Sequence, residues 1–117
     1  MLENTRVEKQ NQSGSAAQED DSGHMLGENG TQIQGSITTG RNGKTERVDV
    51  ENPEPGQRKG DVHYHDAKNT KWRYDVDTGK LIDPDSHEPA PPFIQRVRQA
   101  EWFKKAIEKA LHWLGEI

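Results

Sequence analysis

The run RVDVENPEPGQRKGDVHYH, residues 47–65, decides the fold that we expect for this chain. On both sides of its proline- and glycine-containing centre, apolar and polar residues alternate strictly, which predicts two β-strands joined by a turn. A third run, KWRYDV at residues 71–76, repeats the alternation. Because successive side chains of a strand point to opposite faces, three such strands build a sheet with one apolar and one charged face.

The two faces of this predicted sheet differ in the chemistry that they offer. The apolar face is expected to hold Val48, Val50, Val62, Tyr64, Trp72, Tyr74 and Val76. The charged face is expected to hold Arg47, Asp49, Glu51, Asp61, His63, His65, Lys71, Arg73 and Asp75. A sheet of this kind buries its apolar face and leaves the other face to solvent, so the charged face is the candidate functional surface.

Weaker signals extend the sheet at both ends. Residues 31–39 alternate loosely and predict a first strand. An Asn-Gly turn at residues 42–43 then leads into the strand that begins at residue 45. A short edge strand is expected at residues 80–82. The sequence therefore predicts a small twisted antiparallel sheet of about four strands.

Helical periodicity is confined to the C-terminal part of the chain. Residues 83–92 carry four prolines and predict an extended connector. A short helical segment is expected at residues 93–98, and apolar residues at 3.6-residue spacing predict the main helix at residues 99–114. His87 in the connector and His112 on the helix are expected to be exposed. Because this helix has one apolar side, we expect an α+β domain in which it packs on the apolar face.

Composition divides the chain into two parts. Of the 117 residues, 28% are hydrophobic and 31% are charged, and every Trp, Tyr and Phe follows residue 60. Residues 1–30 are rich in Gln, Asn, Ser, Gly and acidic residues, so we interpret them as a disordered linker or a junction to a carrier protein. His24 is accordingly expected to be a solvated linker residue. Residues 31–117 are the predicted folded domain.

Charge and cysteine content narrow the classes of function. A net charge of −4 argues against a protein that binds nucleic acid through a broad basic surface, although a local basic patch remains compatible with it. The chain has no cysteine, which excludes a disulfide framework and a thiolate zinc site. The sequence predicts neither a secretory signal peptide nor a membrane-spanning segment.

The charged face carries the residue types that cleave RNA without a metal ion or another cofactor. Histidine transfers protons near neutral pH, a carboxylate can be the base, and Arg and Lys stabilise charge on the phosphate. His63 is the first candidate for proton transfer, with Glu51 or His65 as the second group. The remaining catalytic candidates are Arg47 and Asp49. The candidates for substrate binding are Arg58, Lys59, Lys71 and Arg73.

Three other interpretations of the same face stay open. It can be the ordinary solvated side of a sheet, in which cross-strand pairs such as Arg73 with Asp61 add stability. His63 and His65, two residues apart on one strand, could begin the metal site of a DNase, which Asp49 or Asp61 would complete. Finally, the domain could be a non-enzymatic binding module that uses this face for docking.

A longer pattern covers residues 47–64 and reads RVDVENPxPGxRxGxxHY. An aromatic strand and an Asp-x-x-Thr-Gly turn at residues 75–79 follow it. This pattern resembles the C-terminal toxin domains of bacterial polymorphic toxin systems, which include the tips of contact-dependent growth inhibition and Rhs-type effectors. The resemblance extends over residues 30–117, and the residues before them correspond to the junction with a large carrier protein.

The resemblance implies both a fold and a function. Domains of this kind are commonly nucleases, often tRNA-cleaving, and many have a barnase-like α+β fold, although here the clear helix follows the strands instead of preceding them. The resemblance implies an antibacterial toxin that is secreted as the tip of a larger effector and acts in the cytoplasm of the target cell. It also implies a cognate immunity protein. The motif positions that it carries over, without individual roles, are Arg47, Asp49, Glu51, Arg58, His63 and Tyr64.

Overall fold

The structure is a computed structural model that describes residues 24–117. Its five antiparallel strands form one sheet in which each strand pairs with the next along the chain. They are β1 (Ile33–Asn42), β2 (Glu46–Asn52), β3 (Asp61–His65), β4 (Lys71–Asp75) and β5 (Lys80–Ile82). The sheet has five strands rather than about four, because the short edge segment pairs with β4 over its whole length.

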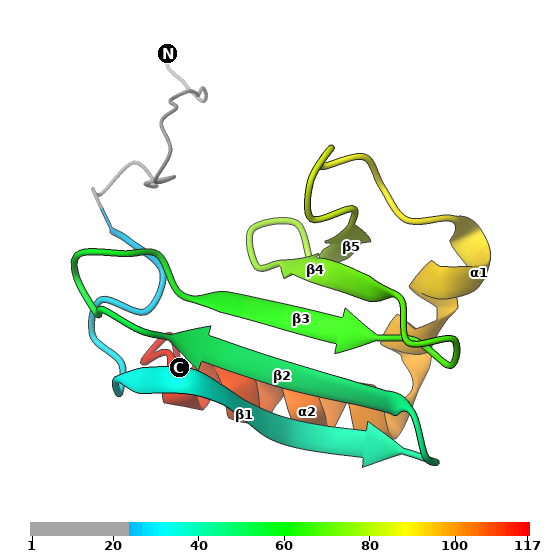
Figure 1. The fold of residues 1–117 in the computed structure, drawn as a ribbon, viewed down its shortest axis with the longest axis horizontal. Helices are drawn as coiled ribbons and strands as arrows, with labels where there is room; N and C mark the ends of the chain where they lie inside the picture. The colour runs from blue at the N-terminus through cyan, green and yellow to red at the C-terminus, as the bar shows by residue number, and fades with distance from the viewer. Residues whose placement is uncertain (1–23) are drawn as a thin grey trace.

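The helical part follows the sheet, as predicted. It consists of α1 (Pro92–Gln95), the 3₁₀ helix η1 (Arg96–Gln99) and the main helix α2 (Glu101–Trp113). Helix α2 crosses one face of the sheet and contacts β1 and β2, as Figure 1 shows. The predicted α+β class is therefore confirmed. Among residues 24–117, no helix combines the length and the apolar character that crossing a membrane requires.

The strict alternation in β2 and β3 builds the centre of the core. Val48 is the cross-strand partner of Tyr64, and Val50 is the partner of Val62. The three valines are fully buried, and Tyr64 is only 3% exposed. Trp72, on β4, continues the same face and is partly buried against the core. The apolar face that the sequence predicts is therefore the face that the domain buries.

Phe103 is the aromatic residue through which α2 meets the sheet. Its ring makes edge-on contacts with Tyr64 at 5.6 Å and with Tyr74 at 6.1 Å between ring centroids. Trp102 packs beside it at 5.9 Å. The other buried residues on this side of the helix and just beyond its end are Ala106, Ile107, Ala110 and Leu114. The predicted apolar side of the helix thus packs on the apolar face of the sheet.

Strand β1 is the irregular strand of the sheet. Its pairing with β2 shifts between Ile33 and Ile37 and again between Thr38 and Gly40, which marks β-bulges. At the second shift, the backbone of Gly40 runs close to α2. A Cβ atom on Gly40 would lie 2.6 Å from the Cβ of Ala106, so only glycine fits without a shift. The absent side chain is therefore what lets strand and helix approach each other here.

Residues 24–30 pack against the domain, although the sequence assigned them to the linker. Asn52, which is fully buried, donates from Nδ2 to the carbonyl oxygens of Gly27 at 2.9 Å and Thr31 at 3.0 Å. The backbone N–H of Gly60 donates to the carbonyl oxygen of Leu26 at 2.8 Å. Because backbone groups of this segment form hydrogen bonds with the rest of the domain, residues 24–30 are part of the folded domain.

His24 is not the solvated linker residue that the sequence suggested. Its Nε2 lies 2.7 Å from Oε2 of Glu116, and its Nδ1 lies 3.3 Å from Oε1 of Glu28. The same oxygen of Glu116 accepts the backbone N–H of Gly27 at 3.1 Å. The local composition gave no sign of this contact, because its partner lies near the other end of the chain. Residues 1–23, which hold the rest of the predicted linker, lie outside the described residues.

The close approach of β1 to α2 predicts that Gly40→Ala destabilises the domain. The new Cβ forces a shift of Ala106, and overpacking of this kind costs about 1–3 kcal/mol of unfolding free energy. Gly35→Ala, on the same strand, is the matched control, because a Cβ there has open space around it. Urea unfolding of both variants measures the difference. Equal stability of the two variants would contradict the packing described here.

Candidate functional site

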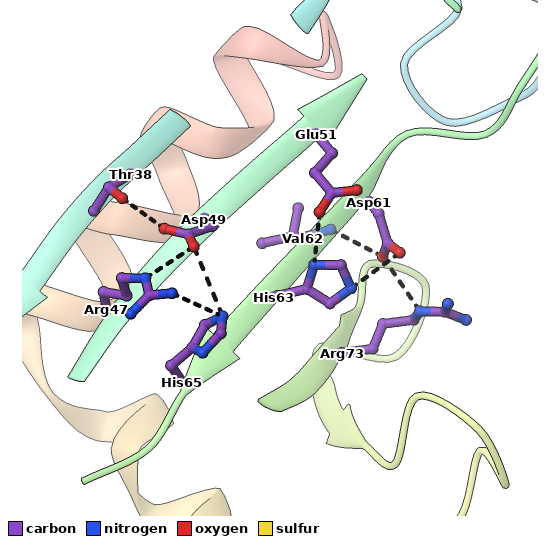
Figure 2. A network of polar contacts seen from close by, with 9 residues as sticks. All are labelled: Thr38, Arg47, Asp49, Glu51, Asp61, Val62, His63, His65 and Arg73. Atoms are coloured by element: carbon purple, nitrogen blue, oxygen red, sulfur yellow. Dashed lines mark hydrogen bonds and ion pairs between the residues drawn. The ribbon is translucent and has the colours of Figure 1, made fainter. Parts of the chain in front are cut away.

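The charged face of the sheet lies on the side away from α2, and Figure 2 shows its side chains in two neighbouring groups. Cross-strand pairing fixes these neighbours. On β2 and β3, Arg47 pairs with His65, and Asp49 pairs with His63. On β3 and β4, His63 pairs with Arg73. The structure therefore brings together all five of the predicted catalytic residues, which are Arg47, Asp49, Glu51, His63 and His65.

The first group, which we call the His63 cluster, consists of Glu51, Asp61, His63 and Arg73. Asp61 lies at its centre. Its Oδ2 is 3.2 Å from Nε2 of His63, and its Oδ1 is 3.2 Å from Nε of Arg73. Glu51 approaches His63 from the other side, with 3.6 Å between Oε2 and Nδ1. The imidazole is thus held between two carboxylates.

The members of the His63 cluster differ in how much of each side chain is exposed to solvent. The side chain of His63 is only 6% exposed, whereas that of Glu51 is 39% exposed. The interpretation of this face as solvated is therefore wrong for His63, because neighbouring residues cover its side chain. Its Nδ1 is buried and has no hydrogen-bond partner among the described residues. Glu51 is the more exposed of the two carboxylates, at 39% against 23% for Asp61, and His63 lies directly behind it.

Asp61 keeps its negative charge at neutral pH. Burial raises the pKa of this carboxyl, but the hydrogen bond and charge of His63, the charge of Arg73 and the N–H of Val62 together hold the pKa of Asp61 below its ordinary value. Val62 donates that backbone hydrogen bond at 3.0 Å. A fixed anion at this position favours the orientation of His63 in which Nε2 faces Asp61 and Nδ1 faces Glu51.

The second group, which we call the Asp49 cluster, consists of Thr38, Arg47, Asp49 and His65. The Thr38 hydroxyl donates to Oδ1 of Asp49 at 2.6 Å, and Nε of Arg47 donates to Oδ2 at 2.9 Å. His65 lies 3.7 Å from the same Oδ2 through Nε2. On its other side, Nδ1 of His65 is 3.2 Å from Oδ1 of Asn69. The carboxylate of Asp49 therefore anchors the guanidinium and the imidazole.

The charges of the Asp49 cluster set the protonation of its members. Burial raises the pKa of Asp49, but the hydrogen bonds from Thr38 and Arg47 and the charge of Arg47 lower it further than burial raises it. Burial and the neighbouring Arg47 lower the pKa of His65. His65 is accordingly biased toward the neutral form, which can accept a proton and cannot supply one.

The predicted substrate-binding residues are more dispersed. Arg73 belongs to the His63 cluster, and Lys71 is exposed at the end of β4 opposite His65. Arg58 and Lys59 are exposed in the connection between β2 and β3. Lys59 lines a cleft of about 550 Å³, whose wall also includes Asp61 and Arg73 of the His63 cluster.

Tyr64, a motif position, belongs to the core. Its hydroxyl donates to Oε2 of Glu46 at 2.5 Å. Burial, followed by this hydrogen bond and the charge of Glu46, raises the pKa of Tyr64 above its usual range. The phenol therefore stays protonated at neutral pH, which fits a structural role on the side of the sheet that α2 covers.

Besides Thr38 of the Asp49 cluster, sequence reasoning missed one residue beside the site, His87. It is exposed, as expected, but its Nε2 lies 3.4 Å from Nη1 of Arg73. The contact joins β4 to the loop after β5, and no local periodicity predicts such a contact. The composition of that loop, with its many prolines, indicated only an extended path.

The two histidines of the DNase interpretation do not share their carboxylate neighbours. His63 and His65 share a face of β3, but their nearest carboxylates differ: Asp61 and Glu51 flank His63, and Asp49 flanks His65. Within residues 24–117, no three His, Asp or Glu side chains are grouped so that they could hold a metal ion.

Comparison of the chain with models of known protein families, with curated proteins and with solved structures finds no match.

The polar contacts of Asp49 predict that stability depends on its charge. Because the pKa of Asp49 is lower in the folded than in the unfolded state, its contribution is present above the unfolded pKa of about 3.9 and is lost as pH falls through the folded pKa. Asp49→Asn should therefore cost about 1–3 kcal/mol at pH 7, and this deficit should shrink in acid. Urea unfolding from pH 7 to pH 3 measures it.

Asp85→Asn is the control for this series, because Asp85 is exposed in the loop before α1. Its unfolding curve should follow that of the unsubstituted protein at every pH. A deficit of Asp49→Asn that is the same at pH 7 and pH 3 would show that the charge of Asp49 does not stabilise the fold.

Proposed function

We propose that this domain is an antibacterial toxin that cleaves RNA, and tRNA in particular, by metal-independent general acid–base catalysis. The observation that carries the proposal is the His63 cluster. It combines an accessible carboxylate, an imidazole 3.6 Å behind it and a guanidinium on the same face of the sheet. These are the groups that proton transfer and phosphate stabilisation require.

Glu51 is the group that we assign to the first proton transfer. It is the most exposed member of the cluster, and a carboxylate can take the proton of a ribose 2′-hydroxyl as this oxygen attacks the neighbouring phosphorus. His63 orients Glu51 and can share its proton through Nδ1. The 3.6 Å separation is slightly longer than a hydrogen bond, as is common before a substrate tightens such contacts.

Two guanidinium groups are available for the charge that develops on the phosphate. Arg73 extends from the His63 cluster and Arg47 from the Asp49 cluster, and their side chains are 31% and 30% exposed. Each is anchored by one carboxylate, so its position is fixed before the substrate arrives. An anchored guanidinium loses little conformational freedom when it binds an anion, which favours stabilisation of the transition state.

The resemblance to polymorphic toxin domains supports the biological part of the proposal. In this setting the domain is secreted as the tip of a larger effector and acts in the cytoplasm of a competing bacterium. A cognate immunity protein protects the producing cell. Such a protein would block catalysis most directly by covering Glu51 and Arg73, because these are the two most exposed side chains of the His63 cluster and both take part in the proposed reaction.

The full-length chain should cleave total tRNA and leave a 2′,3′-cyclic phosphate, with and without EDTA. Plasmid DNA incubated in parallel should stay intact. Cleavage that EDTA abolishes, or cleavage of the plasmid, would instead support the metal-dependent DNase interpretation. No cleavage of either substrate would favour the binding module.

Substitutions then connect the activity to the cluster. Glu51→Gln removes the base without changing its size and should lower the cleavage rate about 10²-fold or more. Glu108→Gln is the matched control, because Glu108 is exposed on α2, away from the charged face. The control should cleave at the unsubstituted rate. Thermal unfolding of both variants separates a loss of catalysis from a loss of structure.

A further inference from the structure

The loop between β5 and α1 brings a third histidine to the charged face. Nε2 of His87 lies 3.4 Å from Nη1 of Arg73, and Nε of the same guanidinium lies 3.2 Å from Oδ1 of Asp61. Arg73 therefore stands between Asp61 and His87 and connects His87 to the residues of the proposed reaction. Unlike His63, His87 is exposed, so a bound molecule can contact its ring directly.

The backbone of this loop holds His87 in a conformation that is rare for residues with a side chain. Its φ is 66°, in the left-handed region. Asp83 stabilises the loop: its Oδ1 accepts the N–H groups of Asp85 at 2.8 Å and Ser86 at 2.9 Å, and its carbonyl oxygen accepts the N–H of His87 at 2.9 Å. Strained backbone that the surroundings fix in this way is concentrated at functional sites.

An arginine and a histidine held side by side form a site for an anion. While His87 is neutral, Nη1 of Arg73 can donate to Nε2. Once His87 is protonated, both groups are cations and both are donors, so a phosphate oxygen between them relieves their repulsion and accepts from each. Lys59 lines the same cleft and adds a further positive charge.

The surroundings of His87 contain charges of both signs. Asp83, in its own loop, interacts electrostatically with His87. The charged residues that line the shared cleft are Lys59, Asp61, Arg73, Asp75, Asp77 and Glu116. Two of these carboxylates already have a partner: Asp61 pairs with Arg73, and Glu116 pairs with His24. Arg73, whose side chain lies on the charged face of the sheet, is the cation in contact with His87.

The other two histidines of the charged face are poorly suited to donate a proton to a leaving group. His63 is buried, and carboxylates occupy the space next to both of its ring nitrogens. His65 is biased toward the neutral form by burial and Arg47, which lower its pKa. The proposed reaction still requires an acid, because the departing oxygen must take up a proton.

We propose that His87 and Arg73 bind the scissile phosphate of RNA and that His87 is the catalytic acid of the site. This assignment rests on the RNA cleavage proposed above. The 2′-oxygen, whose proton passes to Glu51, forms a bond to phosphorus, and the bond between phosphorus and the 5′-oxygen breaks. Nε2 of the His87 imidazolium gives its proton to that 5′-oxygen. The products are a 2′,3′-cyclic phosphate and a 5′-hydroxyl.

His87→Gly is the informative variant. Glycine adopts a φ of 66° without strain, so this substitution removes the imidazole while the loop keeps its backbone and the melting temperature does not fall. The rate of tRNA cleavage should drop about 10²-fold or more. The limb of the pH profile on which activity declines as pH rises should disappear, and added imidazole should restore part of the rate. His112→Ala, an exposed histidine on α2, is the control and should change nothing.

Binding is tested separately by NMR titration of the histidine rings in the full chain, with and without inorganic phosphate. Phosphate should move the titration midpoint of His87 upward and leave that of His112 in place. If phosphate has no effect on His87, the anion site is refuted. If phosphate acts but no RNA is cleaved, the site stands and the proposed function fails. If His87→Gly cleaves tRNA at the original rate with the original pH profile, RNA cleavage stands and His87 is not its acid.

Discussion

The packing of one helix on one face of the sheet is the constraint from which the rest of this structure follows. Phe103 meets Tyr64 and Tyr74, and the absent side chain of Gly40 lets β1 lie close to the helix at Ala106. Only 28% of the residues are hydrophobic, and a single main helix covers one side of the sheet. The opposite face is therefore free to collect polar side chains, which is why a candidate site exists there at all.

The side chains of the charged face partly bury one another, so their charges must be neutralised by neighbours instead of by water. Asp61 lies between His63 and Arg73, and Asp49 lies between Arg47 and His65. Removing one partner of such a group leaves the other buried without compensation, which destabilises the fold. Stability and the proposed chemistry thus depend on the same contacts, and the two readouts must be measured together for any substitution on this face.

The sequence predicted the two faces of the sheet because the direction of a strand side chain is a local property. It placed His63 on the correct face, but burial depends on neighbours from β2 and β4, and single-strand alternation does not describe them. The partner of Arg73 on the loop after β5 was missed for the same reason. The packing of residues 24–30 was missed because Asn52 and Glu116, which hold them, lie far along the chain.

The contact of His24 with Glu116 closes a loop of 92 residues, almost the entire described chain. Closing so long a loop has a large entropic cost, and the contact gains stability only once the sheet and α2 have brought its two ends together. We therefore expect it to form late in folding and to open early in unfolding. Loss of either partner removes the same contact, whichever end of the sequence is altered.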